Sequence, residues 1–312
     1  MRITNYELQI TRPARFFPAL VILCALCAFA GTAFAQSNLE FFAETIRRGN
    51  VEQKRDALFQ IRNLENAAAS GVAVSALTDK SEIVRATAAF SVIFLPADEA
   101  VAVLSPLLND KKELVRREAA YALGKTRNPG AVNSLLRILQ KDKILEVRAA
   151  SVVALGEIGD ASAVPELVKI LQRKPIEKEE FLRRSAARSI GQIARIIQTN
   201  KVKVQTPEDF LPDKNISIAE PKYPNLIEAF PTFRAANAAL IQTLQNPREA
   251  DDVKRETAFA LGAIGDASAI PVLQSNSDAE DYYLAQISRE ALRKIRLLRK
   301  LTSGNKSLPN RP

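Results

Sequence analysis

Small and apolar residues recur in this chain with a helical spacing, and the spacing itself repeats. Residues 146–171 read EVRAASVVALGEIGDASAVPELVKIL, and residues 252–273 read DVKRETAFALGAIGDASAIPVL. With the residue before the shared Arg or Lys as position 0, small residues fall at positions 4 and 7, Leu or Ile at 8 and Gly at 9. Positions 0, 4, 7, 8 and 11 lie on one face of a helix. This pattern predicts an internal repeat built from helices.

The repeat returns about every 31–35 residues. Position 1 is held in turn by Lys54, Arg85, Arg116, Arg148, Arg183, Lys254 and Ala285. One interval, of 71 residues, is about twice the period, so one repeat carries an insertion. Each repeat is too short to bury its apolar face alone and has to stack on its neighbours. We therefore expect an all-α protein, a right-handed α-solenoid of about seven helix pairs.

These motifs resemble the HEAT-like repeat family of the phycobilisome-lyase type, over roughly residues 40–300. The resemblance implies the solenoid fold, but the family spans many roles and so indicates no activity. Phycobilin lyases share the repeat, but they act inside the cell. Because the start of this sequence predicts export, as described next, a bilin-lyase-like enzyme is a disfavoured alternative. Deoxyhypusine hydroxylase is a related HEAT-like enzyme whose di-iron site needs His-Glu pairs. Because this sequence has no His, that activity is not transferred.

The first 35 residues predict a secretory signal peptide. Arg12 and Arg15 precede an apolar run at 16–30, and Ala33-Phe34-Ala35 supplies a small-residue cleavage site before Gln36. The alternative is an uncleaved anchor, since the run barely reaches spanning length. We expect export to the periplasm or beyond the cell, a solenoid over residues 36–301 and a disordered tail over 302–312.

Composition argues against catalysis. The sequence has no His, and both of its cysteines, Cys24 and Cys27, lie in the expected signal peptide. The mature chain thus lacks the commonest general base and the usual zinc ligands, so we expect no catalytic residue, metal or cofactor. Removal of the first 35 residues lowers the formal net charge from +9 to +7. This mild excess makes an anionic polymer or nucleic acid a second, less favoured partner.

Acidic residues stand six positions before the repeated basic residue in four repeats. The pairs are Asp79 and Arg85, Asp110 and Arg116, Asp142 and Arg148, and Glu177 and Arg183. An acid in the turn can reach the Arg of its own or a neighbouring repeat. We interpret the series as a structural ladder that sets the register of the repeats, and not as a row of general acids.

Position 6 carries unexpected aromatic residues. On a helical wheel it lies about 150° from the centre of the apolar face, so its side chain should point away from the core, on the concave face. It is held by Phe59, Phe90, Tyr121, Val153, Arg188 and Phe259. Four of these residues, Phe59, Phe90, Tyr121 and Phe259, are aromatic. If their rings are half-exposed, they form an apolar patch as large as those at which proteins bind partners. The expected function is a scaffold that binds a protein or peptide there, unless neighbouring repeats cover the rings.

The insertion, residues 198–231, holds five prolines and no helical spacing. Its aromatic residues are Phe210, Tyr223 and Phe230. A loop of this length is either functional or disordered, so these residues either bind a partner or pack on the outside of the fifth and sixth repeats. The final helix is rich in Arg and Lys, which suits either a polar cap on the solenoid or contact with an anionic surface.

Overall fold

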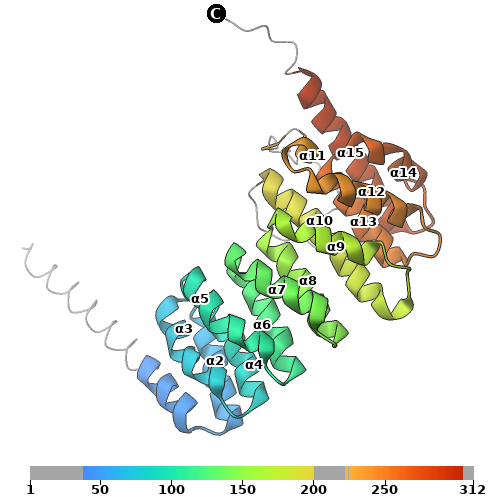
Figure 1. Ribbon diagram of the computed structural model, residues 1–312. Coiled ribbons are helices and arrows are strands. Elements are labelled where there is room, and N and C mark those ends of the chain that lie inside the picture. The colour runs from blue at the N-terminus through green and yellow to red at the C-terminus, as the bar shows by residue number, and fades with distance from the viewer. Residues whose placement is uncertain (1–37, 200–221, 224, 305–312) are drawn as a thin grey trace, which may run out of the picture.

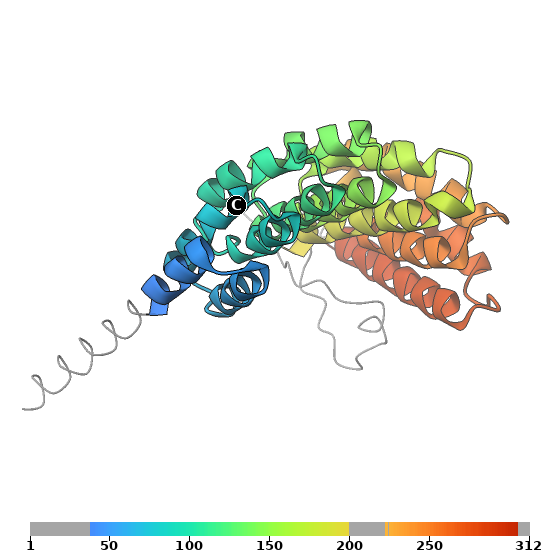
Figure 2. The same cartoon turned by 90° about the horizontal axis from the view of Figure 1, so that it is seen from below.

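The computed structural model describes residues 38–199, 222–223 and 225–304. Across these ranges the chain forms helices and turns, without a strand. The helices form seven antiparallel pairs that stack side by side into an arch (Figures 1 and 2). The predicted all-α solenoid of about seven helix pairs is therefore confirmed.

The first helices of the pairs are residues 38–48, α3 (Ala67–Ala73), α5 (Ala97–Leu104), α7 (Val132–Lys141), α9 (Val164–Leu171), α12 (Thr232–Gln245) and α14 (Ile270–Ser275). The second helices are α2 (Val51–Asn63), α4 (Glu82–Ser91), α6 (Glu113–Thr126), α8 (Leu145–Ile158), α10 (Glu180–Thr199), α13 (Asp251–Ile264) and α15 (Tyr282–Gly304). A short helix, α11 (Leu226–Ala229), precedes α12. The second helices contact one another more extensively than the first helices do, and they line the inner side of the arch (Figure 2).

Small residues at repeat position 7 join successive second helices. The Ser91 hydroxyl on α4 donates to the Leu58 carbonyl on α2 over 2.8 Å, and the Ser189 hydroxyl on α10 donates to the Val152 carbonyl on α8 over 2.9 Å. Both serines are buried. A small side chain at this position therefore lets two helices approach, and a hydroxyl there also ties them together.

Glycine and aspartate residues form the turns between some of the repeats. Gly159 and Gly265 end α8 and α13 with φ of 81°, a left-handed conformation that favours glycine. Neither Ser162 nor Ser268 caps the element that follows. A short 3-10 turn precedes each new helix, and the side chains of Asp160 and Asp266 cap these turns. Each carboxylate accepts a hydrogen bond from the backbone N–H of Ser162 or Ser268.

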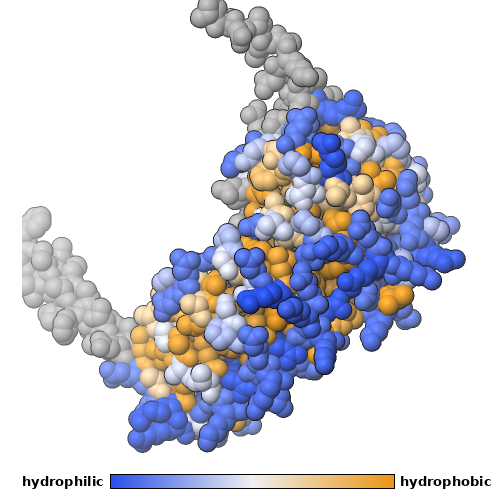
Figure 3. Space-filling model, viewed as in Figure 1, coloured by the Kyte–Doolittle hydropathy of each residue, from blue (hydrophilic) through white to orange (hydrophobic). Residues whose placement is uncertain are grey.

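Small apolar side chains form part of the outer face. Apolar residues gather over α3 and α5 (Figure 3), where Ala67, Ala68 and Ala102 are exposed and Val72 and Val103 are half-buried. The last helix runs to Gly304, three residues into the expected tail. None of the described helices is long and apolar enough to cross a membrane. The expected signal peptide lies outside the described residues.

Candidate functional site

The side chain at repeat position 9 sets how closely successive second helices pack. From the third repeat to the sixth this position is glycine, and a Cβ atom on Gly191 would lie 2.7 Å from the Phe259 ring. In the first two repeats the same position holds Arg62 and Ile93. A bare backbone at this position lets the neighbouring helix approach closely. The N-terminal end of the inner layer lacks this glycine, and Ile93 already lies beyond the end of α4.

An open groove of about 260 Å³ lies at that end. We call it the inner groove; its lining residues are Phe59, Arg62, Ile83, Ala86, Thr87, Phe90, Ser91, Leu114 and Glu118. All of them belong to α2, α4 and α6, so the groove opens on the concave side. Phe59 is 58% exposed and Ile83 41% exposed. The Arg62 guanidinium lies over the Phe90 ring, 5.1 Å from its centroid. This cation–π contact stabilises the positions of both side chains in the groove.

The predicted aromatic stripe becomes progressively covered along the chain. Phe59 is exposed, and Phe90, Tyr121 and Val153 are half-buried. Arg188 is half-buried and its guanidinium donates to Glu256 over 2.9 Å. Phe259 is only 8% exposed, so the expectation that it faces the solvent was wrong. Its ring occupies the space that Gly191 leaves on α10. Sequence reasoning missed that Gly191, at position 9 of the preceding repeat, leaves room for this ring.

The ladder residues pair between neighbouring repeats. Lys54 binds Asp79 over 2.7 Å, Arg85 binds Asp110 over 2.8 Å and Arg116 binds Asp142 over 2.7 Å. Each arginine makes a two-pronged contact with its aspartate and also donates to the backbone carbonyl of Asp79 or Asp110 in its own turn. We call this series the ion-pair ladder. It joins the first four repeats and includes Lys54, whose own repeat lacks the expected acid.

Ionic hydrogen bonds keep the ladder acids charged. Burial acts to raise the pKa of Asp110, but hydrogen bonds from Arg85 and from the Lys112 N–H outweigh it and hold the pKa below its ordinary value of 3.8. Asp79 and Asp142 have lowered pKa values for the same reasons, against the same effect of burial. A carboxylate that is held ionised by its partners is poorly suited to donate a proton. This chemistry fits a structural role.

The ladder does not continue as predicted beyond Asp142. Arg148 donates to the Leu139 carbonyl over 3.2 Å, and no ion pair joins it to Glu177 in the described structure. The longer link between α9 and α10 places Glu177 in an exposed 3-10 turn, out of register with the earlier acids. Arg183 instead forms a buried ion pair with Glu249, which follows the insertion. The guanidinium also donates to three backbone carbonyls, those of Ile170, Leu171 and Arg173.

Two of the three aromatic residues of the insertion can be placed. The rings of Tyr223 and Phe230 meet edge to face with centroids 5.2 Å apart, and Phe230 packs against the core. The backbone N–H of Lys222 donates to the Gln198 carbonyl over 2.9 Å, which fastens the end of the insertion to α10. These two rings lie on the solenoid and away from the inner groove. Phe210 lies outside the described residues.

The basic residues of the last helix are largely engaged with acids. Arg289 pairs with Asp278 over 3.3 Å, and Arg293 and Lys294 pair with Glu290 over 2.8 and 3.7 Å. Burial lowers the pKa of Lys294, against the attraction of Glu290. These pairs reduce the positive charge that α15 offers to an anionic polymer. The arrangement fits a cap that ends the stack.

Comparisons with known proteins agree with this architecture. A model of HEAT repeats matches residues 72–156, and a model of the PBS lyase HEAT-like repeat matches residues 147–173 and 253–278. Among solved structures, an engineered protein has a TM-score of 0.50 and 20% identity over 83% of this chain and 68% of its own. Curated protein sequences give no match.

Two natural structures resemble the chain less closely. The complex of CpcE and CpcF of phycocyanin lyase from Nostoc sp. has a TM-score of 0.46 and 18% identity, over 85% of this chain and 94% of its own. Human deoxyhypusine hydroxylase in complex with glycerol has a TM-score of 0.39 and 18% identity, over 86% and 99%. Identities this low concern the fold alone. The chain thus contains HEAT repeats over residues 72–156 and repeats of the PBS lyase HEAT-like type at 147–173 and 253–278, and its seven helix pairs have the fold that such repeats form.

Proposed function

We propose that this protein is an exported, non-catalytic scaffold that binds a segment of a partner protein in the inner groove. The observation that carries the proposal is the exposure of large apolar side chains, Phe59 and Ile83, on the concave face. Exposed apolar surface of this kind costs solvation free energy and is typical of interaction sites. A repeat solenoid is suited to binding proteins, because its concave surface is long and continuous.

The shape of the inner groove favours side chains of a polypeptide as the occupant. Its volume of about 260 Å³ is below the range of about 300–1,000 Å³ that is usual for small-molecule sites. It is open along the arch, with Arg62 and Glu118 at the rim of an apolar floor. An amphipathic helix that places one or two apolar residues on Phe59 and Phe90 would fit this pattern of apolar floor and charged rim.

Two features of the sequence support the other parts of the proposal. The absence of His from the whole chain removes the residue that most often acts as a general base, which favours a binding role over catalysis. The apolar run at 16–30, followed by Ala33-Phe34-Ala35, favours export. Because Cys24 and Cys27 both precede the expected cleavage site, the exported chain would need no disulfide chemistry.

The test is a capture experiment with a variant that alters only exposed side chains. The double variant Phe59→Ser with Ile83→Ser removes the apolar wall of the inner groove. The matched control is Phe181→Ser, since Phe181 is 47% exposed and lies on α10 outside the groove. Each protein is used to capture partners from an envelope extract, and the captured proteins are identified by mass spectrometry. Circular dichroism and thermal unfolding establish that all three chains are equally folded.

We expect the wild type and Phe181→Ser to retain the same partner and the double variant to lose it. Purified partner then permits a direct titration, in which the loss of two apolar contacts should weaken binding by at least about tenfold. A partner that all three proteins retain equally would show that the inner groove is not the binding surface. An exported chain should also be found without residues 1–35, which N-terminal sequencing of the cellular protein measures.

A further inference from the structure

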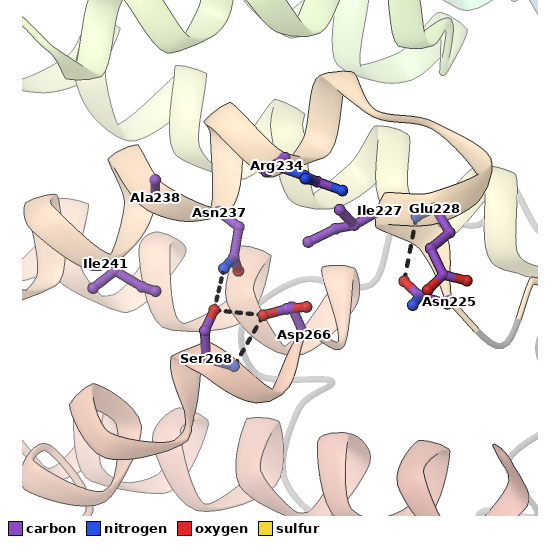
Figure 4. Close-up of a pocket in the computed structure, with 9 residues that line it drawn as sticks. All are labelled: Asn225, Ile227, Glu228, Arg234, Asn237, Ala238, Ile241, Asp266 and Ser268. Atoms are coloured by element: carbon purple, nitrogen blue, oxygen red, sulfur yellow. Dashed lines mark hydrogen bonds between the residues drawn. The ribbon is translucent and has the colours of Figure 1, made fainter.

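A second cavity, of about 350 Å³, lies in the C-terminal half of the arch (Figure 4). We call it the C-terminal cavity. It is formed where α11 meets α12 and the 3-10 turn η7 (Ala267–Ala269). Its lining residues are Asn225, Ile227, Glu228, Arg234, Asn237, Ala238, Ile241, Asp266 and Ser268. None of them belongs to the inner groove, so this cavity needs an explanation of its own.

Asn237 presents a buried acceptor at this cavity. Its side chain is 4% exposed, and its amide N–H donates to the Ser268 hydroxyl over 2.8 Å. The Ser268 hydroxyl in turn donates to the Asp266 carboxylate, which can only accept. This relay fixes the orientation of the amide, because the hydroxyl has no second proton to give to Asn237. The Asn237 oxygen is therefore the atom that is left without a donor among the described residues.

A buried acceptor without a partner is unfavourable, and it is rare in folded proteins. Figure 4 shows the Asn237 side chain extending from α12 towards Ser268 and Asp266, with Ile227 and Ile241 on either side along the helices. The position thus combines a free carbonyl oxygen with an apolar wall. A ligand that supplies an N–H or O–H bond would satisfy the oxygen.

The charges around the cavity indicate which donor it takes. Asp266 accepts hydrogen bonds from the backbone and hydroxyl of Ser268 but has no cationic partner in the described structure. Glu228 is exposed and likewise forms no ion pair there. Against these two carboxylates stands a single cation, Arg234, which is exposed at the surface. Acceptors with negative charge dominate, so a cationic donor is favoured over a neutral one.

We propose that the C-terminal cavity binds a primary ammonium group carried on a short aliphatic chain. An ammonium has three N–H bonds, which suit the Asn237 oxygen and the carboxylates of Asp266 and Glu228. The aliphatic chain would lie on Ile227 and Ile241. A free alkylamine and the lysine side chain of a polypeptide share this chemistry, and the two sources are separated by the test.

The experiment is isothermal titration of the full chain with n-butylamine, with n-butanol as the neutral probe of similar size. We expect butylamine to bind and butanol to bind at least about tenfold more weakly, which corresponds to the loss of one charge-assisted hydrogen bond. A capped tripeptide with a central lysine, and its norleucine counterpart, test the second source. Tighter binding of the lysine peptide identifies a polypeptide ligand, whereas binding of butylamine alone identifies a free amine.

Two variants assign the binding to the cavity. Glu228→Gln removes one carboxylate from an exposed position, and we expect it to weaken butylamine binding about tenfold with no change in unfolding temperature. The control is Glu65→Gln, an exposed acid outside the cavity. Asn237→Leu removes the buried acceptor and should abolish binding; if it unfolds, Glu228→Gln still decides. Equal binding of butylamine and butanol, no binding of either, or equal effects of the two Gln variants would overturn the proposal.

Discussion

The N-terminal and C-terminal halves of the arch use the same repeat differently. The first two repeats have Arg62 and Ile93 where the next four have glycine, and the ring of Phe59 stays in the solvent. In the fifth and sixth, glycine at the same position lets α13 close on α10, and the ring of Phe259 is covered. The concave face is therefore open at its N-terminal end and closed around Phe259.

The ion pairs made by the arginine at repeat position 1 also differ between the two halves. The ion-pair ladder of the N-terminal half joins neighbouring turns through pairs that keep some contact with water, such as Arg85 and Asp110 with side chains 9% and 13% exposed. The corresponding pair of the C-terminal half, Arg183 and Glu249, has side chains only 2% and 1% exposed. Deeper burial makes the loss of one partner more costly, because the other charge is left without solvent.

The largest expected effect comes from Arg183. Arg183→Met should lower the free energy of unfolding by about 3–5 kcal/mol, since Glu249 and three backbone carbonyls lose their donor in a buried place. Arg85→Met should cost less, about 1.5–3 kcal/mol, because water can reach Asp110. Urea denaturation of the two variants measures the difference. Equal losses would contradict the distinction between the halves.

A methyl group added at Gly191 tests the close packing of α10 on α13. The new Cβ atom would lie 2.7 Å from the Phe259 ring and 2.9 Å from the Ala260 Cα atom, so one helix has to shift. We expect Gly191→Ala to destabilise the protein by about 1–3 kcal/mol. The ring of Phe259 should become more accessible as the helices part, which hydrogen exchange of α13 reports. An unchanged midpoint of unfolding would mean that the interface has room to spare.

These contrasts also show what could be read from the sequence. The spacing of Leu155, Gly156 and Gly159 and its return at Leu261, Gly262 and Gly265 were enough for the helix pairs, because each repeat is a local pattern. The pairing of Arg183 with Glu249 was not predictable. The two residues are 66 positions apart, the insertion separates them, and Glu249 falls outside the six-residue spacing of the other acids.

The candidate sites were only partly predictable for a similar reason. A helical wheel gives the direction of Phe59 and Phe259 but not what the next repeat places opposite each ring. The contrast between Arg62 and Gly191 was present in the sequence as a signal, although it acquires meaning only once the helices are stacked. Asn237 gave no signal at all, because its unpaired oxygen depends on a turn that begins thirty residues later, at Ala267.

Acid should weaken the ion-pair ladder. Asp79, Asp110 and Asp142 have pKa values below the ordinary 3.8, so the stability they contribute is present above that value and is lost as the pH falls through their lowered pKa values. Burial raises the pKa of Glu256 in the C-terminal half, against the hydrogen bond from Arg188, so protonation of Glu256 acts in the opposite direction. Urea denaturation from about pH 6 to about pH 3 should therefore show a loss of stability that is shallower in Asp110→Asn. If the free energy of unfolding falls equally with pH in the wild type and in Asp110→Asn, the loss of stability in acid does not come from the ladder.

The smallest effect should have the opposite sign. Gly71 lies within α3 on the outer face of the N-terminal half, and a Cβ atom there would meet nothing within 4 Å. Gly71→Ala makes the same chemical change as Gly191→Ala, but without a neighbour to displace. Alanine restricts the unfolded chain more than glycine and is the better helix former, so the variant should gain about 0.5–1 kcal/mol. Thermal unfolding of the two variants side by side measures both signs. A loss at Gly71 would mean that the outer face of α3 is covered in solution, and the N-terminal half would then be less open than its packing indicates.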